Sequence, residues 1–163
     1  MNTSDCNEKE ERFITNPAND FRFFLVQIPE EAVTLILKNG NVVLVGSVDA
    51  KGTPNIAPRF VLAVLENEKL LFADAFKNKT FSNIKAWKKV AVTVMDRQTM
   101  GGFQLKGDAV EVEDKEVIAQ AHAKLKEHGI NAKPEKAWTL NVNEVYSLKP
   151  DSTSKNPLIS AYG

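Results

Sequence analysis

The chain has 163 residues, 43% of them hydrophobic and 26% charged, so it can bury the core of one ordinary domain and is neither a large multidomain protein nor a disordered one. Lys and Arg number 21, as do Asp and Glu, and this zero formal charge argues against a partner among nucleic acids or anionic membranes. The single cysteine, Cys6, cannot form an intrachain disulfide, which fits the cytoplasm. No apolar run reaches bilayer length and no export signal is recognisable, so neither membrane spanning nor export is expected.

The first third of the chain predicts an arm followed by a helix. Residues 1–28 are mostly polar, and the apolar cluster around Phe23 is expected to lie over the core or against a partner subunit. Pro29 and the acids that follow it suit the first turn of a helix, which we predict from Glu30 to Asn39. Gly40 is the expected stop.

An antiparallel meander is predicted next. Residues 42–48, 54–65 and 70–75 are rich in β-branched and apolar side chains and are joined by tight turns. Pro58 interrupts the second strand, which places it at a sheet edge, at a bulge or beside a ligand. Consecutive strands with tight turns favour a barrel or sandwich over a doubly wound sheet.

The second half alternates helices with strands. A helix is predicted over 78–88 with Asn78 as its N-cap, then a hairpin of strands 89–96 and 103–112. A third helix is expected to begin at Asp114 and to end at Gly129, and a sixth strand covers 137–148. We therefore expect a mainly β domain over 29–148 with short helices, between the N-terminal arm 1–28 and a C-terminal tail 149–163.

The usual catalytic constellations are missing from the sequence. His122 and His128 lie six residues apart on one predicted helix, roughly 120° out of register, so they cannot bind one metal together and we interpret them as partly exposed helix residues. Cys6 has no nearby basic residue to activate it as a nucleophile. No nucleophile elbow or glycine-rich nucleotide loop occurs, which argues against acyl transfer and nucleotide hydrolysis.

One local pattern has the composition of an anion site. Asn78, Lys79 and Thr80 place backbone amides, a hydroxyl and an ammonium at the positive end of a predicted helix, although an ordinary cap with a solvated lysine has the same sequence. Arg59 lies in an otherwise apolar strand and would need an anion, either a phosphate or a carboxylate of the protein. Lys106 on the fifth strand presents the same two alternatives.

The order of these motifs resembles a known family. Residues 44–54 (LVGSVDAKGTP) resemble the opening hairpin of the pyridoxamine 5'-phosphate oxidase-like FMN-binding split barrels. Residues 71–74 followed by 79–84 look like the family's third strand and phosphate-binding turn, and 102–109 look like its glycine-punctuated fifth strand. The likeness covers roughly residues 30–148. It implies a six-stranded antiparallel split β-barrel, FMN as cofactor, and a homodimer with the flavin at the subunit interface.

The resemblance also implies a set of cofactor-binding residues. These are Arg59, Phe60, Asp74, Ala75, Lys79, Thr80 and Gln104. Lys79 and Thr80 would contact the FMN phosphate, and Arg59 would lie near the phosphate or the ring. The backbone at 74 and 75 would run along the flavin, and Gln104 would reach the ring edge.

The likeness narrows the expected function. Pyridoxamine phosphate oxidases carry a tryptophan and an Arg-Leu-x-Pro segment near the C-terminus, whereas residues 146–150 here read YSLKP, so vitamin B6 oxidation is not expected. Haem-handling relatives need an axial histidine, and neither histidine is expected to reach the barrel groove. We predict an FMN-dependent oxidoreductase or electron-transfer protein that uses a small-molecule electron donor or acceptor, with no residue assigned to acid–base catalysis. A module that binds flavin or another ligand without turnover, and a barrel that serves only as an interaction domain, are the alternatives.

Overall fold

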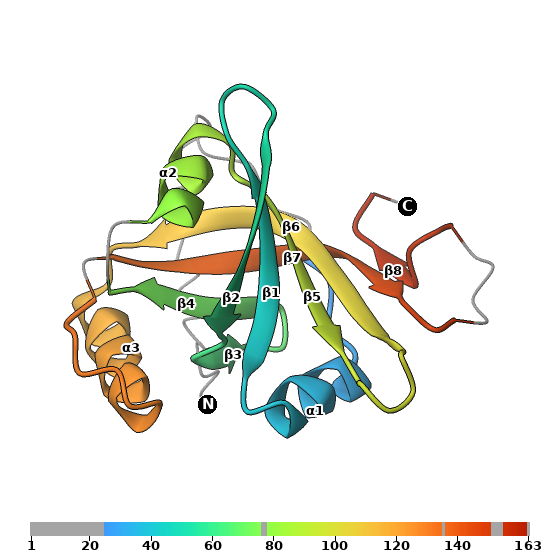
Figure 1. The fold of residues 1–163 in the computed structure, drawn as a ribbon, viewed down its shortest axis with the longest axis horizontal. Helices are drawn as coiled ribbons and strands as arrows, with labels where there is room; N and C mark the ends of the chain where they lie inside the picture. Colours follow the sequence, from blue (N-terminus) through green and yellow to red (C-terminus); the bar gives the residue numbers. More distant parts are fainter. Residues whose placement is uncertain (1–24, 76–77, 135, 151–154, 163) are drawn as a thin grey trace, which may run out of the picture.

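The computed structural model describes residues 25–75, 78–134, 136–150 and 155–162. Within them, eight strands form one antiparallel sheet with three short helices around it (Figure 1). The strand order is β2-β1-β5-β6-β7-β4-β3, and β8 pairs with β7. The strands are β1 (Val42–Val48), β2 (Pro54–Phe60), β3 (Ala63–Leu65), β4 (Lys69–Asp74), β5 (Lys89–Met95), β6 (Gly102–Val112), β7 (Lys136–Ser147) and β8 (Ile159–Ser160). The helices are α1 (Glu30–Lys38), α2 (Lys79–Ala86) and α3 (Lys115–Glu127).

The sheet is curled around an apolar interior. Along β1 and β5 every second side chain is buried, as the two-residue repeat of a strand requires when one face covers a core. The interior holds the stacked rings of Phe72 and Trp138, whose centroids lie 4.4 Å apart. This arrangement is the antiparallel split barrel that the sequence predicts.

The helices begin and end where local signals predict. Asn78 caps α2, because its side chain accepts a hydrogen bond from the Phe81 amide (3.0 Å), and Asp114 caps α3 in the same way. Gly129 follows α3 with a φ of 77°, a conformation that glycine adopts without strain. Helix α2 lies against β1 and β2, α1 contacts β5 and β6, and α3 covers β4 and β7 over a second apolar cluster.

Two expectations about the strands need correction. The predicted strand 54–65 is divided into β2 and β3, because the Val61 amide donates to the carbonyl of Asn41 while the next amide, Leu62, donates to Leu71. The chain therefore changes its partner from β1 to β4 at this point, and Pro58 lies in an edge strand, where no amide is needed. The tail also contributes β8, which pairs with β7, so two short strands join the six predicted ones.

None of the three helices, within the residues that the structure describes, has the length and apolar character needed to cross a membrane.

Candidate functional site

An ion pair joins the edge strand β2 to β4, near the other end of the strand order, at the predicted site. Arg59 belongs to the edge strand β2 and Asp74 to the end of β4, and Arg59 Nε lies 3.3 Å from Asp74 Oδ1. The Arg59 side chain is 19% exposed and that of Asp74 only 4%, so neither charge has full access to water. The sequence allows either a phosphate or a carboxylate of the protein as the partner of Arg59, and the fold provides a carboxylate, that of Asp74.

One buried nitrogen of the Arg59 guanidinium lacks a hydrogen-bond acceptor. Its Nη2 donates to Thr80 Oγ1 (3.0 Å) and its Nη1 to the carbonyl of Pro58 (2.8 Å). Its Nε is close to Asp74 but lacks the geometry of a hydrogen bond, and among the described residues it is the one buried side-chain nitrogen or oxygen without a partner. The charge of Arg59 is thus only partly satisfied within the protein, and an anion in contact with the guanidinium would stabilise it further.

The start of α2 presents two neighbouring residues in opposite directions. Thr80 is 1% exposed, and its hydroxyl accepts hydrogen bonds from Arg59 and from Asn55 Nδ2 (3.3 Å). The Lys79 side chain is 56% exposed, and its Nζ lies 3.8 Å from Asp49 Oδ2 in the β1–β2 turn. Lys79 is therefore accessible to a ligand, whereas Thr80 is positioned to hold Arg59 from inside.

Asp49 is fixed by its own turn. Its Oδ1 accepts from the amides of Thr53 and Lys51, each at 2.9 Å. The Thr53 amide is the main cause that lowers the pKa of Asp49 below its ordinary value, and the Lys51 amide and the Lys79 charge act in the same direction. Asp49 is thus an anion that competes with any ligand for Lys79.

A cavity of about 340 Å³ opens beside the Arg59–Asp74 pair. Four of the predicted residues line it, namely Arg59, Phe60, Asp74 and Ala75. Asn78 and apolar side chains from β1, β4 and the end of α3 complete its wall. Thr80 joins these four residues through its hydrogen bond to Arg59, whereas Lys79 is next to Thr80 in sequence but extends toward Asp49 and does not line the cavity.

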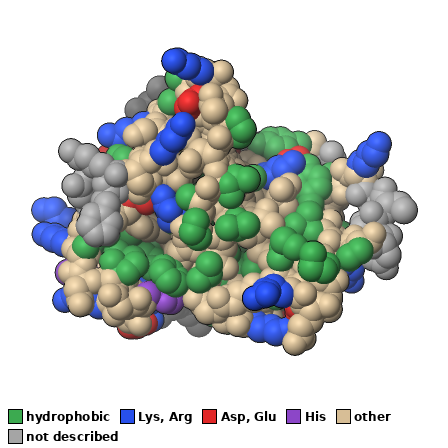
Figure 2. Space-filling view, in the orientation of Figure 1, with side chains coloured by type: hydrophobic (Ala, Val, Ile, Leu, Met, Phe, Trp, Pro, Cys, Tyr) green, Lys and Arg blue, Asp and Glu red, His purple; other side chains and the backbone are tan. Residues whose placement is uncertain are grey.

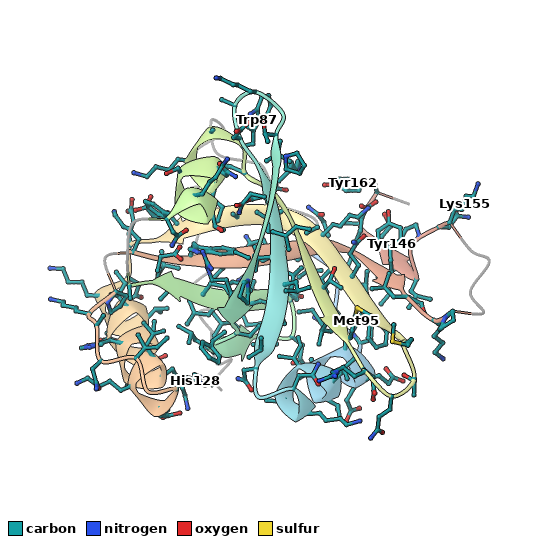
Figure 3. All side chains as sticks on the ribbon, in the orientation of Figure 1. Trp87, Met95, His128, Tyr146, Lys155 and Tyr162 are labelled. Carbon is teal, nitrogen blue, oxygen red and sulfur yellow. The ribbon has the colours of Figure 1, made fainter. Side chains whose placement is uncertain are left out.

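Gln104 lies elsewhere in the sheet. It pairs with Thr93 of β5 and with Tyr146 of β7, and the row continues from Thr93 through Leu44 to Pro58 of β2. Three strand spacings of about 4.8 Å each therefore separate Gln104 from β2. Tyr146, its neighbour on β7, lies on the side of the molecule near β8 (Figure 3). Within one copy of the chain, Gln104 does not reach the cavity.

The histidines are half-buried residues at α3, as the sequence predicts. His128 nevertheless comes closer to the site than expected, because its ring stacks on Phe60 with centroids 4.2 Å apart (Figure 3). His128 therefore packs against Phe60, a residue that lines the cavity. No cluster of three or more metal-ligating side chains occurs within the described ranges of the chain.

Two other features lie apart from this cavity. Lys106 makes a cation–π contact, because its Nζ lies 4.2 Å from the centroid of the Tyr146 ring. A larger hollow of about 870 Å³ lies between α1, the β5–β6 hairpin and the segment before β8. None of the seven predicted residues lines that hollow.

Two residues of the site escaped the sequence reasoning. Trp138 Nε1 donates to Asp74 Oδ2 at 3.0 Å, across 64 positions of sequence, and no local pattern signals such a contact. Asn55 contacts Thr80, and here a signal exists. Asn55 and Arg59 are four residues apart on one strand, so the two-residue repeat places them on the same face.

The chain belongs to the pyridoxamine 5'-phosphate oxidase-like family. The model of the family described as pyridoxamine 5'-phosphate oxidase matches residues 28–149. An uncharacterized protein of Methanocaldococcus jannaschii, MJ0282, is 33% identical over 132 residues, which are 78% of this chain and 87% of that protein.

Solved structures share the fold. HupZ of Group A Streptococcus superposes with a TM-score of 0.67 at 23% identity, covering 78% of this chain and 98% of that one. A candidate pyridoxamine 5'-phosphate oxidase from Lactobacillus delbrueckii gives 0.59 at 27% identity, with 77% and 97% covered. An FMN-binding protein from Syntrophomonas wolfei (TM-score 0.64, covering 74% of this chain and 85% of that one) and a heme-binding protein from Mycobacterium smegmatis (0.57, covering 75% and 55%) are each 18% identical to this chain. The fold is thus common to proteins that carry different cofactors.

Proposed function

We propose that this protein binds FMN and acts as an oxidoreductase or electron-transfer protein. The observation that carries the proposal is the meeting of a buried guanidinium, whose Nε lacks a hydrogen-bond acceptor, with the start of α2 beside an accessible Lys79. A phosphate suits these donors, because it offers several charged acceptor oxygens to a guanidinium, an ammonium and a helix N-terminus. Because the chain belongs to this family, we propose FMN as the phosphate-bearing ligand.

The residues present divide the work of holding FMN. Arg59 and Lys79 would contact the phosphate, Thr80 would keep Arg59 in place, and Phe60 with the backbone at 74 and 75 would border the rest of the cofactor. Bound FMN supplies a ring that accepts two electrons and a proton from a reduced donor and passes them to an acceptor. The protein then has to orient donor and ring, which requires position more than an acid or base of its own.

The outer face of the sheet supports a homodimer. Val42, Leu44 and Val48 project from β1 on this face, with Ile56 of β2 and Met95 of β5 beside them, and all five are exposed. Hydrophobic side chains gather over β1 and β2 in Figure 2. An apolar surface of this kind is typical of a protein–protein interface. Gln104 projects from the same face, so it would contribute to a flavin groove only in the dimer.

The homodimer is tested by Ile56→Lys. Ile56 is 71% exposed on this face, in the edge strand β2, and Leu37 is 60% exposed on α1, outside it, so Leu37→Lys is the matched control. Light scattering after gel filtration should give twice the chain mass of 18.1 kDa for the wild type and for Leu37→Lys, and the single-chain mass for Ile56→Lys. A wild-type protein that runs as one chain contradicts the dimer.

FMN binding is tested by the absorbance spectrum of the purified protein and by titration with FMN. Flavin bands that shift on binding support the proposal, and their bleaching by a reduced nicotinamide, followed by reoxidation with an acceptor, supports turnover. Tight binding without reduction by any donor indicates a module that only holds the flavin. A haem spectrum, or a colourless protein that ignores FMN, refutes the proposed cofactor.

A further inference from the structure

We infer that the buried carboxylate of Asp74 is a positioning residue that sets both halves of the phosphate site at once, the guanidinium of Arg59 and the start of α2. The inference rests on the proposed function, since it concerns the same site. The family resemblance implies only that the backbone at Asp74 runs along the flavin. The inference gives the Asp74 carboxylate a separate role.

Asp74 is surrounded by donors. Its Oδ2 accepts from Trp138 Nε1 at 3.0 Å, and its Oδ1 accepts from Asn78 Nδ2 at 2.8 Å. Trp138 is 1% exposed and is stacked on Phe72 in the barrel interior, so the indole holds the carboxylate from a rigid position. A carboxylate fixed at both oxygens determines where the third donor, Arg59, can place its charge.

The same carboxylate reaches the helix through Asn78. The Asn78 amide donates to Asp74 with its nitrogen, while its oxygen accepts from the Phe81 amide and caps α2. Turning the amide over would lose both bonds, so its orientation is determined. Asp74 thereby connects the first turn of α2 to Arg59. Thr80 of α2 makes a second, direct connection, because its hydroxyl accepts a hydrogen bond from Arg59 Nη2.

This arrangement holds the Arg59 side chain in place but does not satisfy all of its hydrogen-bond donors. Asp74 Oδ1 forms an ion pair with Arg59 Nε at 3.3 Å, and this attraction keeps the guanidinium in place. The geometry is not that of a hydrogen bond, so the Nε donor has no acceptor. An incoming phosphate would then find Arg59 already oriented, which spares the binding reaction the cost of ordering a long side chain. Asp74 acts through Arg59 and does not itself contact the anion, which it would repel.

The test compares FMN with riboflavin, because the ratio of their dissociation constants isolates the phosphate. In Asp74→Asn the negative charge that pairs with Arg59 is lost, and the new NH2 group faces a donor in either orientation, so the hydrogen bond from Asn78 or the one from Trp138 is lost with it. We expect the ratio of the riboflavin to the FMN dissociation constant to fall about tenfold, with riboflavin affinity itself unchanged. In an Arg59→Gln background, Asp74→Asn should reduce the ratio by less than it does in the wild type, because only its effect through Asn78 on the start of α2 remains.

Two further variants serve as a control and as an independent test of the role of Asp74. Asp108→Asn alters another buried carboxylate, which is paired with Lys89 and bonded to Asn143, and should leave the ratio unchanged. Trp138→Phe keeps both charges and the ring stack but removes the indole donor, so it should lower the ratio even where Asp74→Asn does not fold.

The outcomes separate the inference from the function on which it rests. A wild-type protein that binds FMN no better than riboflavin overturns the phosphate site and the inference together. A wild type that prefers FMN, with the same preference kept in Asp74→Asn or in a folded Trp138→Phe, leaves the proposed function standing and overturns the role of Asp74. An equal further loss in the Arg59→Gln background also overturns it, because Asp74 would then act independently of Arg59.

Discussion

Lys79 and Asp49 give a pair of substitutions with opposite expected effects on FMN binding. Lys79→Ala removes the accessible ammonium at the start of α2, and Asp49→Asn removes the anion that competes for it. Asp49→Asn keeps a side-chain oxygen for the amides of Thr53 and Lys51, so the β1–β2 turn is preserved. Thr80 is left intact, because its buried hydroxyl holds Arg59 and its loss would confuse the result.

The magnitudes follow from exposure and distance. The two charges lie 3.8 Å apart with side chains 56% and 25% exposed, so water screens the pair and it contributes little to stability. A bond from an ammonium to phosphate contributes more, but at this exposure we expect about 1 kcal/mol, or roughly a fivefold weaker FMN affinity in Lys79→Ala. Removing the Asp49 charge should strengthen FMN binding about twofold.

Fluorescence titration of each variant with FMN and with riboflavin measures both effects. Riboflavin lacks the phosphate, so its affinity should be the same in the wild type and in both variants. Raising the salt concentration should shrink the differences, because screening weakens interactions between exposed charges. The reasoning is refuted if Lys79→Ala binds FMN as well as the wild type does, or if it weakens riboflavin equally.

The remaining predictions concern stability and titration. A Cβ at Gly107 would lie 1.9 Å from the carbonyl oxygen of Asn141 in β7, so Gly107→Ala should cost about 3 kcal/mol and lower Tm by roughly 6–12 °C. At Gly46 the nearest atom would be 3.5 Å away, so Gly46→Ala should change the unfolding free energy by less than about 0.5 kcal/mol; equal effects in thermal unfolding would contradict the packing argument. Burial and then Glu144 raise the pKa of Tyr146 above its ordinary value of 10.0, so its stabilisation is complete below that pH and is lost as pH rises through the folded-state pKa. Glu144→Gln should lower that pKa only partly, as ultraviolet titration of the phenolate would show, and a pKa unchanged in this variant would exclude the role of Glu144.

Several parts of the fold could be predicted because their causes are local. Asn78 and Asp114 cap helices through amides two or three residues away, and Gly129 ends α3 by its own backbone conformation. The alternation of β1 shows which of its side chains face the core. Pro58 could be confined to an edge, a bulge or a ligand contact, because it lacks an amide, although only the sheet order shows that the edge is correct.

The site was predicted as a set of residues, and the tertiary structure decided where each one lies and what it contacts. Arg59 and Thr80 are recognisable from sequence, but their hydrogen bond joins an edge strand to a helix 21 positions away. Nothing local shows that Thr80 points inward while Lys79 points outward. Gln104 was grouped with the others, yet the strand order places it on the outer face, away from the cavity.

By itself, the sequence determined the three helices and most of the strands, the family and the composition of an anion site, because periodicity, caps and motif order are properties of neighbouring residues. The tertiary structure alone decided that the predicted strand 54–65 divides at Val61, where the chain passes from β1 to β4. It also decided that Asp74 meets Trp138, because β4 pairs with β7, and that Asp74 meets Arg59, because the curled sheet brings β2 close to β4. Such contacts depend on how distant strands pair, which no window of neighbouring residues contains.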